Sequence, residues 1–571
     1  MTTGSSLQTD GTRLLQTVVW IALGLAVVYG LWQAIAECWV TDDAFISFRY
    51  AWRLTEGQGL IYNIGERVEG YTNFLWTIIT AGGMALGFEP IRFTQVISIL
   101  SYLSTAGVLV ALSRRIWRGQ QVGRMFIPVA AMAILIQHDY HVWATSGMET
   151  AFVALLITLG FYLLVTGLSS RSILFAGVIL VAGALTRPDA MSFYAVGAVF
   201  VLLARRSRWK SLLAYLLPLV VIYLPYWLWR YDYYGYPFPN TYYAKSAYDS
   251  YWSQGLFYIW LYFKTYYALL SSVLAASALF VLAARQWLSE KGLARIDLRI
   301  GLLGSLMAGA YLLYVARVGG DFMFARFLIP VTPLLLILIE TALARWLNSP
   351  RIALTVALVF LALMIVRWNQ FSAPEQFIEG IVEEKTFYPP EEIEEARHDG
   401  LILRKYFSDI DAPVGIMGAR AVLAYYAQFP VAIECSAGLT DEHIAHQDLP
   451  ERGRPGHEKQ ADYDYLRERG VRFMFFHAPP EYGRYGPVRK ITFEGVVGGI
   501  NSYDPELMNK LKQHPEVQFM DFLVVLDNYI ANMKSIPPAQ PIEDFNFFRQ
   551  YYFDHVDDEP RMRQVVAGLA N

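Results

Sequence analysis

Two adjacent carboxylates, Asp42 and Asp43, follow directly after a long apolar run that ends near residue 36. A carboxylate beside a membrane can take the proton of an incoming hydroxyl group, and burial among apolar helices raises its pKa towards the range useful for a general base. Two neighbouring carboxylates can also hold a divalent cation that bridges to a phosphate group. The simpler alternative is a solvated pair at the N-terminus of the next helix, where negative charge is favourable.

Basic residues near the expected helix ends could bind a phosphate group. Arg49 and Arg53 are four residues apart in an aromatic-rich segment, so a helix would place them on one face at the membrane interface. Lys245, in "NTYYAKS", and Arg326, in "VGGDFMFARFLIP", stand beside long apolar runs, where a phosphate or pyrophosphate would lie. An ordinary surface helix would explain Arg49 and an interface anchor would explain Arg326, so both alternatives stay open.

Polar residues between glycines could bind a polyhydroxylated ring. The segment "GERVEGYTNFLW" contains Glu69, Tyr71 and Asn73, and Asn73 is also suited to cap the helix that follows. Asp321 follows Gly319-Gly320, a pair that lets the backbone approach a ligand closely.

Other motifs point to chemistry less strongly. Arg187 and Asp189 in "LTRPDA" are two residues apart, which favours an internal salt bridge. Asp441, His443 and His446 in "SAGLTDEHIAH" have the residue types of a metal site, but no further ligand stands at a zinc spacing. The sequence contains no P-loop, no GxSxG motif and no HExxH motif.

The composition indicates a membrane protein. The 571 residues are 55% hydrophobic and only 17% charged, and the mean hydropathy is +0.31, which is too apolar for a soluble chain of this length. The net charge of −3 gives no electrostatic basis for binding nucleic acid. Cys38 and Cys435 are the two cysteines, so at most one disulfide is possible, and the sequence leaves their pairing open.

Apolar runs and loop charges together predict about eleven membrane-spanning helices. The expected spans lie near residues 14–36, 91–113, 126–140, 149–168, 172–186, 189–204, 211–230, 257–284, 299–316, 327–345 and 352–369. The basic loop residues are Arg114, Arg115, Arg118, Arg124, Arg171, Arg205, Arg206, Arg208, Lys210, Arg285, Lys291, Arg295, Arg299, Arg345 and Arg351. If residues 73–87 form a surface or re-entrant helix, all of them fall on the same side as Arg13, which the positive-inside rule places in the cytoplasm.

The expected fold is therefore a polytopic α-helical membrane protein with a C-terminal mixed α/β domain outside the cytoplasm. The membrane module covers residues 1–369 and includes juxtamembrane helices at 42–57 and 73–87. Residues 370–571 are charged and lack spanning runs. There the runs "APVGIMG", "FPVAIEC" and "VRFMFF" predict strands and "EEIEEARHDGLILRKYF" predicts a helix.

Several of these segments resemble a known family. An acidic pair directly after the first span, then a juxtamembrane helix, many spans and an external domain is similar to the GT-C glycosyltransferases. More closely, "DDAFISFRYAWRLTEGQGLIYNIGERVEGYTNFLW", "TRPDA", "PNTYYAK", "GGDFMFARFLIP" and "GLTDEHIA … GRPGHEK" resemble the mycobacterial terminal β-(1→2)-arabinofuranosyltransferases. The resemblance is strongest over residues 40–80 and 317–330.

The resemblance implies an enzyme of a bacterial plasma membrane. Such an enzyme moves a pentose, expected to be arabinofuranose, with inversion from a decaprenyl- or undecaprenyl-phosphate donor to a hydroxyl of a glycan, lipid or protein acceptor. Carried over to this sequence, Asp42 is the expected base, and Asp43 orients it or binds a divalent cation. Arg49, Lys245 and Arg326 would then balance the donor phosphate. The sugars would contact Glu69, Tyr71, Asn73, Asp321 and His443.

Two other functions remain as alternatives. A transporter or flippase of a lipid-linked sugar would require polar residues or broken helices within several spans, together with internal repeats. A membrane-anchored binding or sensing module would place the function in residues 370–571, although such a domain requires far fewer spans.

Overall fold

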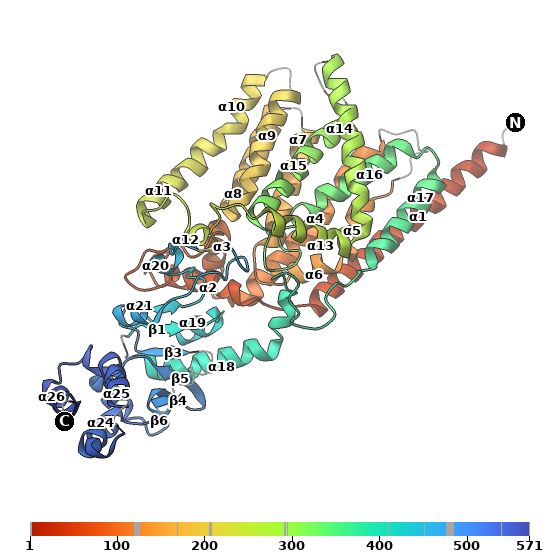
Figure 1. Ribbon diagram of the computed structural model, residues 1–571. Helices are drawn as coiled ribbons and strands as arrows, with labels where there is room; N and C mark the ends of the chain where they lie inside the picture. The colour runs from red at the N-terminus through yellow and green to blue at the C-terminus, as the bar shows by residue number, and fades with distance from the viewer. Residues whose placement is uncertain are drawn as a thin grey trace.

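The computed structural model describes residues 3–118, 126–167, 169–204, 208–290, 293, 295–408, 410, 412–418, 420–449, 451–475, 485–537 and 540–569. Arg124, Arg205, Arg206 and Lys291, which contributed to the orientation prediction, lie outside these residues. Figure 1 shows a helical bundle with the long helix α1 along one side and a C-terminal sheet domain at one end.

Five helices in the described part of the chain are long and apolar enough to cross a bilayer. They are α1 (Thr3–Ala36), α4 (Pro90–Arg118), α10 (Arg208–Pro218) continued by η2 (Leu219–Tyr223) and α11 (Leu224–Tyr234), η3 (Tyr267–Leu270) continued by α14 (Ser271–Glu290), and α15 (Ile296–Val318). Shorter apolar helices are α3 (Phe74–Ala85), α7 (Thr150–Thr166), α8 (Ser170–Thr186), η1 (Pro188–Ala190) with α9 (Met191–Ala204), and α17 (Pro350–Ile365). The bundle also contains α2 (Asp42–Thr55), α5 (Val129–Ile136), α6 (His138–Trp143), α12 (Asn240–Ala244), α13 (Trp252–Thr265) and α16 (Thr332–Trp346).

Two of the expected apolar runs are interrupted in the structure. The run 257–284 divides at Tyr266, where the backbone leaves the helical region (φ −124°, ψ 70°) and the phenol donates to Asp139 Oδ2 at 2.6 Å. The run 126–140 divides at Gln137, whose extended backbone (ψ 119°) lets its amide donate to the Tyr262 hydroxyl at 2.7 Å. In both cases apolar composition continues through a turn, so hydropathy does not detect the break.

The C-terminal residues form the predicted mixed sheet. Its strands are β1 (Val414–Ile416), β2 (Ala432–Glu434), β3 (Phe473–Phe475), β4 (Lys490–Phe493), β5 (Val496–Ile500) and β6 (Val517–Phe519). Their order is β2-β1-β3-β5-β4-β6, with β1 parallel to β2 and β3 and the remaining pairs antiparallel. The three sequence runs that predicted strands coincide with β1, β2 and β3.

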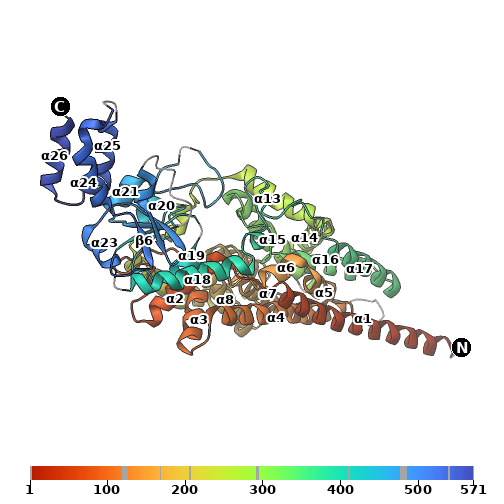
Figure 2. The ribbon, with the colours of Figure 1, turned by 90° about the horizontal axis from the view of Figure 1, so that it is seen from below.

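Helices surround this sheet. They are η4 (Glu384–Phe387), α18 (Pro390–Phe407), α19 (Ala421–Ala427), α20 (Glu442–Ala445), α21 (Tyr463–Glu468), α22 (Gly486–Arg489), α23 (Pro505–Leu511), α24 (Phe522–Asn532), η6 (Met533–Ser535), α25 (Pro541–Phe548), η7 (Arg549–Phe553) and α26 (Glu559–Leu569). Figure 2 shows α18 and α19 between the sheet and the bundle, with α24 to α26 at the far end. The predicted helix at 391–407 corresponds to α18.

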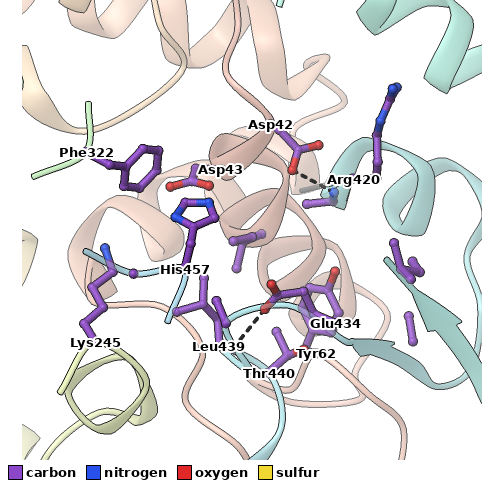
Figure 3. A pocket seen from close by; sticks show the side chains of 16 residues that line it. Asp42, Asp43, Tyr62, Lys245, Phe322, Arg420, Glu434, Leu439, Thr440 and His457 are labelled. Atoms are coloured by element: carbon purple, nitrogen blue, oxygen red, sulfur yellow. Dashed lines mark hydrogen bonds between the residues drawn. The ribbon is translucent and has the colours of Figure 1, made fainter. Parts of the chain in front are cut away.

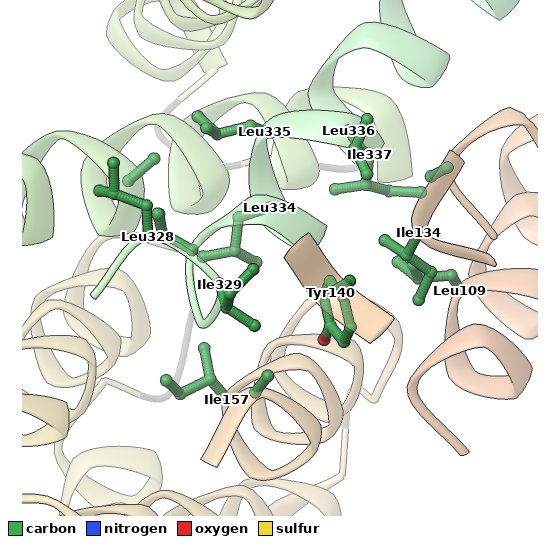
Figure 4. Close-up of a cluster of buried hydrophobic side chains, with 14 of the residues drawn as sticks. Leu109, Ile134, Tyr140, Ile157, Leu328, Ile329, Leu334, Leu335, Leu336 and Ile337 are labelled. Atoms are coloured by element: carbon green, nitrogen blue, oxygen red, sulfur yellow. The ribbon is translucent and has the colours of Figure 1, made fainter. Parts of the chain in front are cut away.

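One hydrophobic core runs through the bundle and into the C-terminal part. Its centre includes Leu109, Ile134, Ile157 and residues 334–337 (Figure 4), and it continues past residue 370 to Val382 and Val422. Helix α2 packs against α3 on one side and α19 on the other, so it lies at the junction between bundle and sheet. The acidic pair at the start of α2 is therefore held by both parts of the protein.

Candidate active site

Asp43 lies where two cavities meet. Ile46, Lys245 and Leu439 line both cavities together with Asp43, and the larger has a volume of about 220 Å³. One cavity extends towards Glu434 and His457 of the C-terminal domain, and the other towards Glu149 and Arg326 of the bundle. In Figure 3 the Asp43 carboxylate lies beside the His457 ring, while Asp42 points towards Arg420 and the start of α19.

The charges around Asp43 have opposing effects on its proton affinity. Burial raises its pKa above the ordinary value, Arg326 and Lys245 lower it, and Asp321 and Glu149 raise it again. A carboxylate with a raised pKa is a stronger base than a free aspartate, while the two cations stabilise its charged form.

Asp42 makes a different set of contacts. Its Oδ2 accepts from the Ala421 N–H at 2.9 Å and its Oδ1 from the Val422 N–H at 3.0 Å, so both carboxylate oxygens are used at the N-terminus of α19. Burial raises its pKa to about 6, against the effect of these two backbone donors. The carboxylate thus caps a helix, although that helix is α19 and not its own α2.

Two cations near Asp43, Arg326 and Lys245, differ in their carboxylate partners. The Arg326 guanidinium is 3.4 Å from Asp321 and 3.6 Å from Glu149, and its Nε has no hydrogen-bond partner among the described residues. The Lys245 ammonium is 6.0 Å from the centre of the Phe322 ring, and no described carboxylate is within 4 Å of it. These donors are available to an anionic ligand.

Two glycines form the turn that precedes Asp321 and Arg326. Gly319 (φ 92°) ends α15 in the left-handed conformation, and Gly320 (φ 73°) follows it. A Cβ at Gly320 would lie 2.5 Å from the Tyr258 ring, so the turn that delivers Asp321 and Arg326 requires glycine there.

A hydrogen-bond network connects the larger cavity to the bundle. Asn73 donates to Glu149 Oε2 at 2.9 Å and accepts from Ser47 at 3.0 Å. Its side chain makes no capping bond to the N-terminus of α3, so the expected cap is not formed. The predicted Arg187–Asp189 salt bridge is confirmed at 2.8 Å, and Arg187 also lies 3.5 Å from Glu149.

Three of the expected ligand-binding residues contact protein groups. Arg49 is buried and donates to the carbonyls of Tyr62, Ala424 and Phe429 at 2.9, 2.5 and 2.6 Å, and it lines neither cavity. Glu69 forms a buried ion pair with Arg230 at 2.6 Å, and burial raises the pKa of Glu69 to about 7. Tyr71 lines the larger cavity, with its hydroxyl 3.1 Å from that of Tyr234.

His443 lines neither of the two cavities that Asp43 lines. It stacks on Tyr465 with ring centres 4.2 Å apart and lines a separate groove. The histidine beside Asp43 is His457, which contacts the Phe322 ring edge-on at 4.6 Å and whose buried Nδ1 has no partner among the described residues. Burial lowers the pKa of His457 to about 4, so its imidazole is neutral at pH 7.

Sequence reasoning also missed other residues of the site. Glu434 lines the same cavity as His457, and Glu384 is buried close enough to interact with Asp43. Burial raises the pKa of each to about 8. "GRPGHEK" was the sequence signal for His457, whereas Glu434 lies at the end of an otherwise apolar strand run.

The described residues contain no group of three or more His, Cys, Asp and Glu side chains that could hold a metal ion. Asp441, His443 and His446 line the separate groove and do not form such a group. Cys38 and Cys435 are both free thiols, so this structure does not pair them.

Known proteins match this chain at a distance. No family model matches the sequence. The chain is 29% identical over 374 residues to a terminal β-(1→2)-arabinofuranosyltransferase of Corynebacterium glutamicum, which covers 58% of this chain and 52% of that protein. It is 29% identical over 261 residues to the protein of that name from Mycobacterium tuberculosis, which covers 43% and 41%. The chain thus aligns with about half the length of these curated relatives.

The solved structures extend the match to the fold. ArnT from Cupriavidus metallidurans in the apo state superposes with a TM-score of 0.51 and 14% identity, covering 87% of this chain and 99% of that chain. ArnT bound to undecaprenyl phosphate gives a TM-score of 0.47 at 14% identity, covering 76% and 87%. The chain is a distant homologue of the terminal β-(1→2)-arabinofuranosyltransferases and has the fold of ArnT.

Proposed function

We propose that the protein is an inverting glycosyltransferase that moves a pentose, arabinofuranose, from a polyprenyl-phosphate donor to a hydroxyl group of an acceptor. The observation that carries the proposal is the position of Asp43, a buried carboxylate at the meeting point of two cavities with Lys245 and Arg326 beside it. Two cavities that share one carboxylate suit a reaction with two substrates. The distant homology to arabinofuranosyltransferases supports the choice of sugar.

In the proposed reaction, the acceptor oxygen attacks the anomeric carbon of the donor sugar. The new glycosidic bond forms on the face opposite the phosphate, and the carbon–oxygen bond to the phosphate breaks, with the electron pair leaving on the phosphate. The base takes the proton of the attacking hydroxyl. The lipid phosphate is a good leaving group, so the reaction does not require a separate acid.

We assign the base to Asp43 and not to Asp42. Both oxygens of Asp42 accept backbone N–H bonds of α19, so accepting a substrate proton would disrupt the helix cap. Asp43 accepts no hydrogen bond from any described residue and lines both cavities. Asp42 is therefore proposed to position α19 against α2, and Asp43 is proposed to act as the base.

The donor phosphate is proposed to lie between Lys245 and Arg326. Lys245 has no carboxylate partner among the described residues, and the Nε of Arg326 makes no hydrogen bond to them, so both side chains can donate to phosphate oxygens, Arg326 in a bidentate manner. Arg49 is left out of this site because three carbonyls already accept from it. Since side-chain cations lie next to Asp43, the arrangement favours charge balance by Lys245 and Arg326 over a cation bound to Asp43.

The sugar-contacting residues proposed here are Tyr71, Asn73 and His457, which line the two cavities, whereas Asp321 lines neither and pairs with Arg326. The bilayer topology of about eleven spans, with a cytoplasmic N-terminus, belongs to the same proposal. It is supported by the basic residues Arg118, Arg171, Arg345 and Arg351, which lie in the first or last turns of α4, α8, α16 and α17.

The test compares two amide variants of the purified full-length protein in lipid. With polyprenyl-phosphoarabinose and an arabinofuranoside acceptor, Asp43→Asn should lower kcat by about 10²–10⁴-fold. Asp42→Asn should retain far more turnover among molecules that remain folded. If Asp42→Asn loses turnover at an unchanged unfolding temperature while Asp43→Asn keeps it, the base assignment is reversed. If the wild-type protein moves the donor lipid across vesicles and forms no glycosidic bond, the flippase alternative replaces the proposal.

A further inference from the structure

A third cavity lies on the outer side of the site, next to the junction of α12 and α20 (Figure 1). It is an open groove with a volume of about 730 Å³, within the roughly 300–1,000 Å³ typical of small-molecule sites. Three chain segments line it: residues 66–68, residues 441–447, and Tyr465 with Arg469, together with Tyr236. Asp43 does not line this groove.

Stacked rings form part of the groove lining. His443 stacks on Tyr465 with ring centres 4.2 Å apart, and His446 lies 5.0 Å from Tyr236 and 4.3 Å from Tyr243. Both histidines are exposed. Ring faces beside hydrogen-bonding groups are a lining that suits sugar rings, which present C–H groups on their faces and hydroxyls at their edges.

The charged groups of the groove nearly balance, and most of them already have partners within the protein. Glu66 contacts Arg469, Asp441 accepts from the Tyr465 hydroxyl at 2.6 Å, and Glu442 accepts from Tyr236. No large excess of one sign is left for a phosphate or an acidic peptide. A neutral ligand that both donates and accepts hydrogen bonds fits this balance better than an ion.

Only a thin wall separates the groove from the Asp43 cavities. Leu439 lines both of those cavities, and Asp441, two residues later, lines the groove. Likewise Gly70 lines the larger cavity and Val68 the groove. Two residues of extended chain span at most about 7 Å, which is close to the length of one sugar unit.

Hydrogen bonds and direct contacts hold the two segments of this wall in place. The Asn240 amide donates to the carbonyls of Gly438, Leu439 and Asp441 at 3.0, 2.9 and 3.2 Å. The Tyr50 hydroxyl donates to the Val68 carbonyl at 2.6 Å. A Cβ at Gly70 would lie 2.8 Å from the Leu439 carbonyl oxygen, so the two segments of the wall are in direct contact.

We infer that this groove binds the inner sugars of an oligosaccharide acceptor whose terminal sugar reaches Asp43. The inference rests on the proposed glycosyl transfer, because it extends the acceptor side of the same site. It names the acceptor as a neutral oligosaccharide, in preference to a single sugar, a lipid or a protein. In this proposal His443 contacts an inner sugar of the acceptor and not the terminal sugar that reacts at Asp43.

The test uses acceptor length. His443→Ala/His446→Ala removes two exposed rings, and His398→Ala, an exposed histidine of α18, is the matched control. Wild type and variants are assayed with a mono-arabinofuranoside and with a linear arabinofuranose hexasaccharide. The double variant should raise KM for the hexasaccharide by about 10-fold and leave kcat/KM for the monosaccharide unchanged.

A second readout does not require catalysis. Saturation-transfer NMR measures binding of the same hexasaccharide to the protein in nanodiscs, in the absence of donor. Weaker binding of the hexasaccharide by the double variant supports the groove, even if no transfer is detected. Absence of transfer by the wild-type protein would contradict the proposed function and not the groove. Equal effects of the double variant on both acceptors, or none on the hexasaccharide in either assay, would overturn the inference.

Discussion

At the residue scale, the acidic pair acts as two separate groups. Consecutive residues of an α-helix point roughly 100° apart, so Asp42 and Asp43 at the start of α2 cannot face the same partner. Asp42 reaches the backbone of α19, and Asp43 faces the two cavities. Both the capping and the catalytic interpretations of the sequence therefore have a physical basis, each for a different member of the pair.

The pH dependence of transfer should report the charges around Asp43. A base acts when deprotonated, and burial raises its pKa, so turnover should fall on the acid side at a higher pH than for an ordinary aspartate. Lys245 lowers that pKa. Lys245→Met should therefore shift the acid limb of the kcat–pH profile to still higher pH, measured at saturating donor.

The comparison for this experiment is Lys405→Met, which removes an exposed lysine of α18 that pairs with Glu494. Its acid limb should coincide with that of wild type. If Lys245→Met raises KM for the donor but leaves the acid limb in place, Lys245 contacts the phosphate and Asp43 is not the group that titrates.

Sequence reasoning found the polar residues near Asp43 that lie in short motifs of the bundle, such as Lys245, Asp321 and Arg326. It did not include His457 or Glu434 in the site, because their distance from Asp43 depends on how a domain more than 300 residues later docks onto α2. It assigned Arg49 to a ligand because an arginine's carbonyl partners, here Ala424 and Phe429, cannot be identified from local sequence.

At the element scale, α2 is the helix that joins the two parts of the protein. Asp42 binds the N-terminus of α19, and Arg49 and Arg53 donate to carbonyls that follow α19, Arg53 to Phe429 at 2.8 Å. The arginine pair that sequence placed at a lipid interface thus fastens the C-terminal domain. This docking brings Glu434 and His457 to the cavity that Asp43 lines.

Asp42→Ala should destabilise this junction. It leaves two buried N–H groups of α19 without acceptors, a loss of about 1–3 kcal/mol in unfolding free energy. The unfolding temperature in detergent should fall, and Asp42→Asn should fall less because its amide oxygen can still accept one bond. Asp43→Asn, which breaks no hydrogen bond to a described residue, should match or exceed wild type. An unchanged temperature for Asp42→Ala would contradict the capping role.

Strands and helices whose hydrophobic residues repeat at a regular spacing were predicted well, but turns within apolar segments were not. The strands β1 to β3 and helix α18 follow from alternation and charge. The breaks at Gln137 and Tyr266 arise from buried hydrogen bonds to Tyr262 and Asp139, which are tertiary contacts between distant helices. Hydropathy averages over such positions and therefore joins the helices on either side.

At the scale of the whole molecule, the candidate site and the basic residues at helix ends belong to different parts of the helical bundle. Asp43, Arg187, Lys245 and Arg326 line one cavity, and Asp43 and Lys245 also line the cavity that extends to the sheet domain. Arg118 and Arg345 lie in the last turns of α4 and α16, and Arg351 lies in the first turn of α17. Under the positive-inside rule this separation supports the proposal that the site and the sheet domain lie outside the cytoplasm.

Cysteine labelling tests this orientation. In a background with Cys38→Ser and Cys435→Ala, His398→Cys on exposed α18 should react with a membrane-impermeant maleimide in spheroplasts. Arg351→Cys, at the exposed start of α17, should react only after the membrane is permeabilised. Both positions are exposed, so a difference in labelling reports sidedness and not burial. Labelling of Arg351→Cys in intact spheroplasts, with His398→Cys protected, would invert the molecule and place Asp43 on the cytoplasmic side.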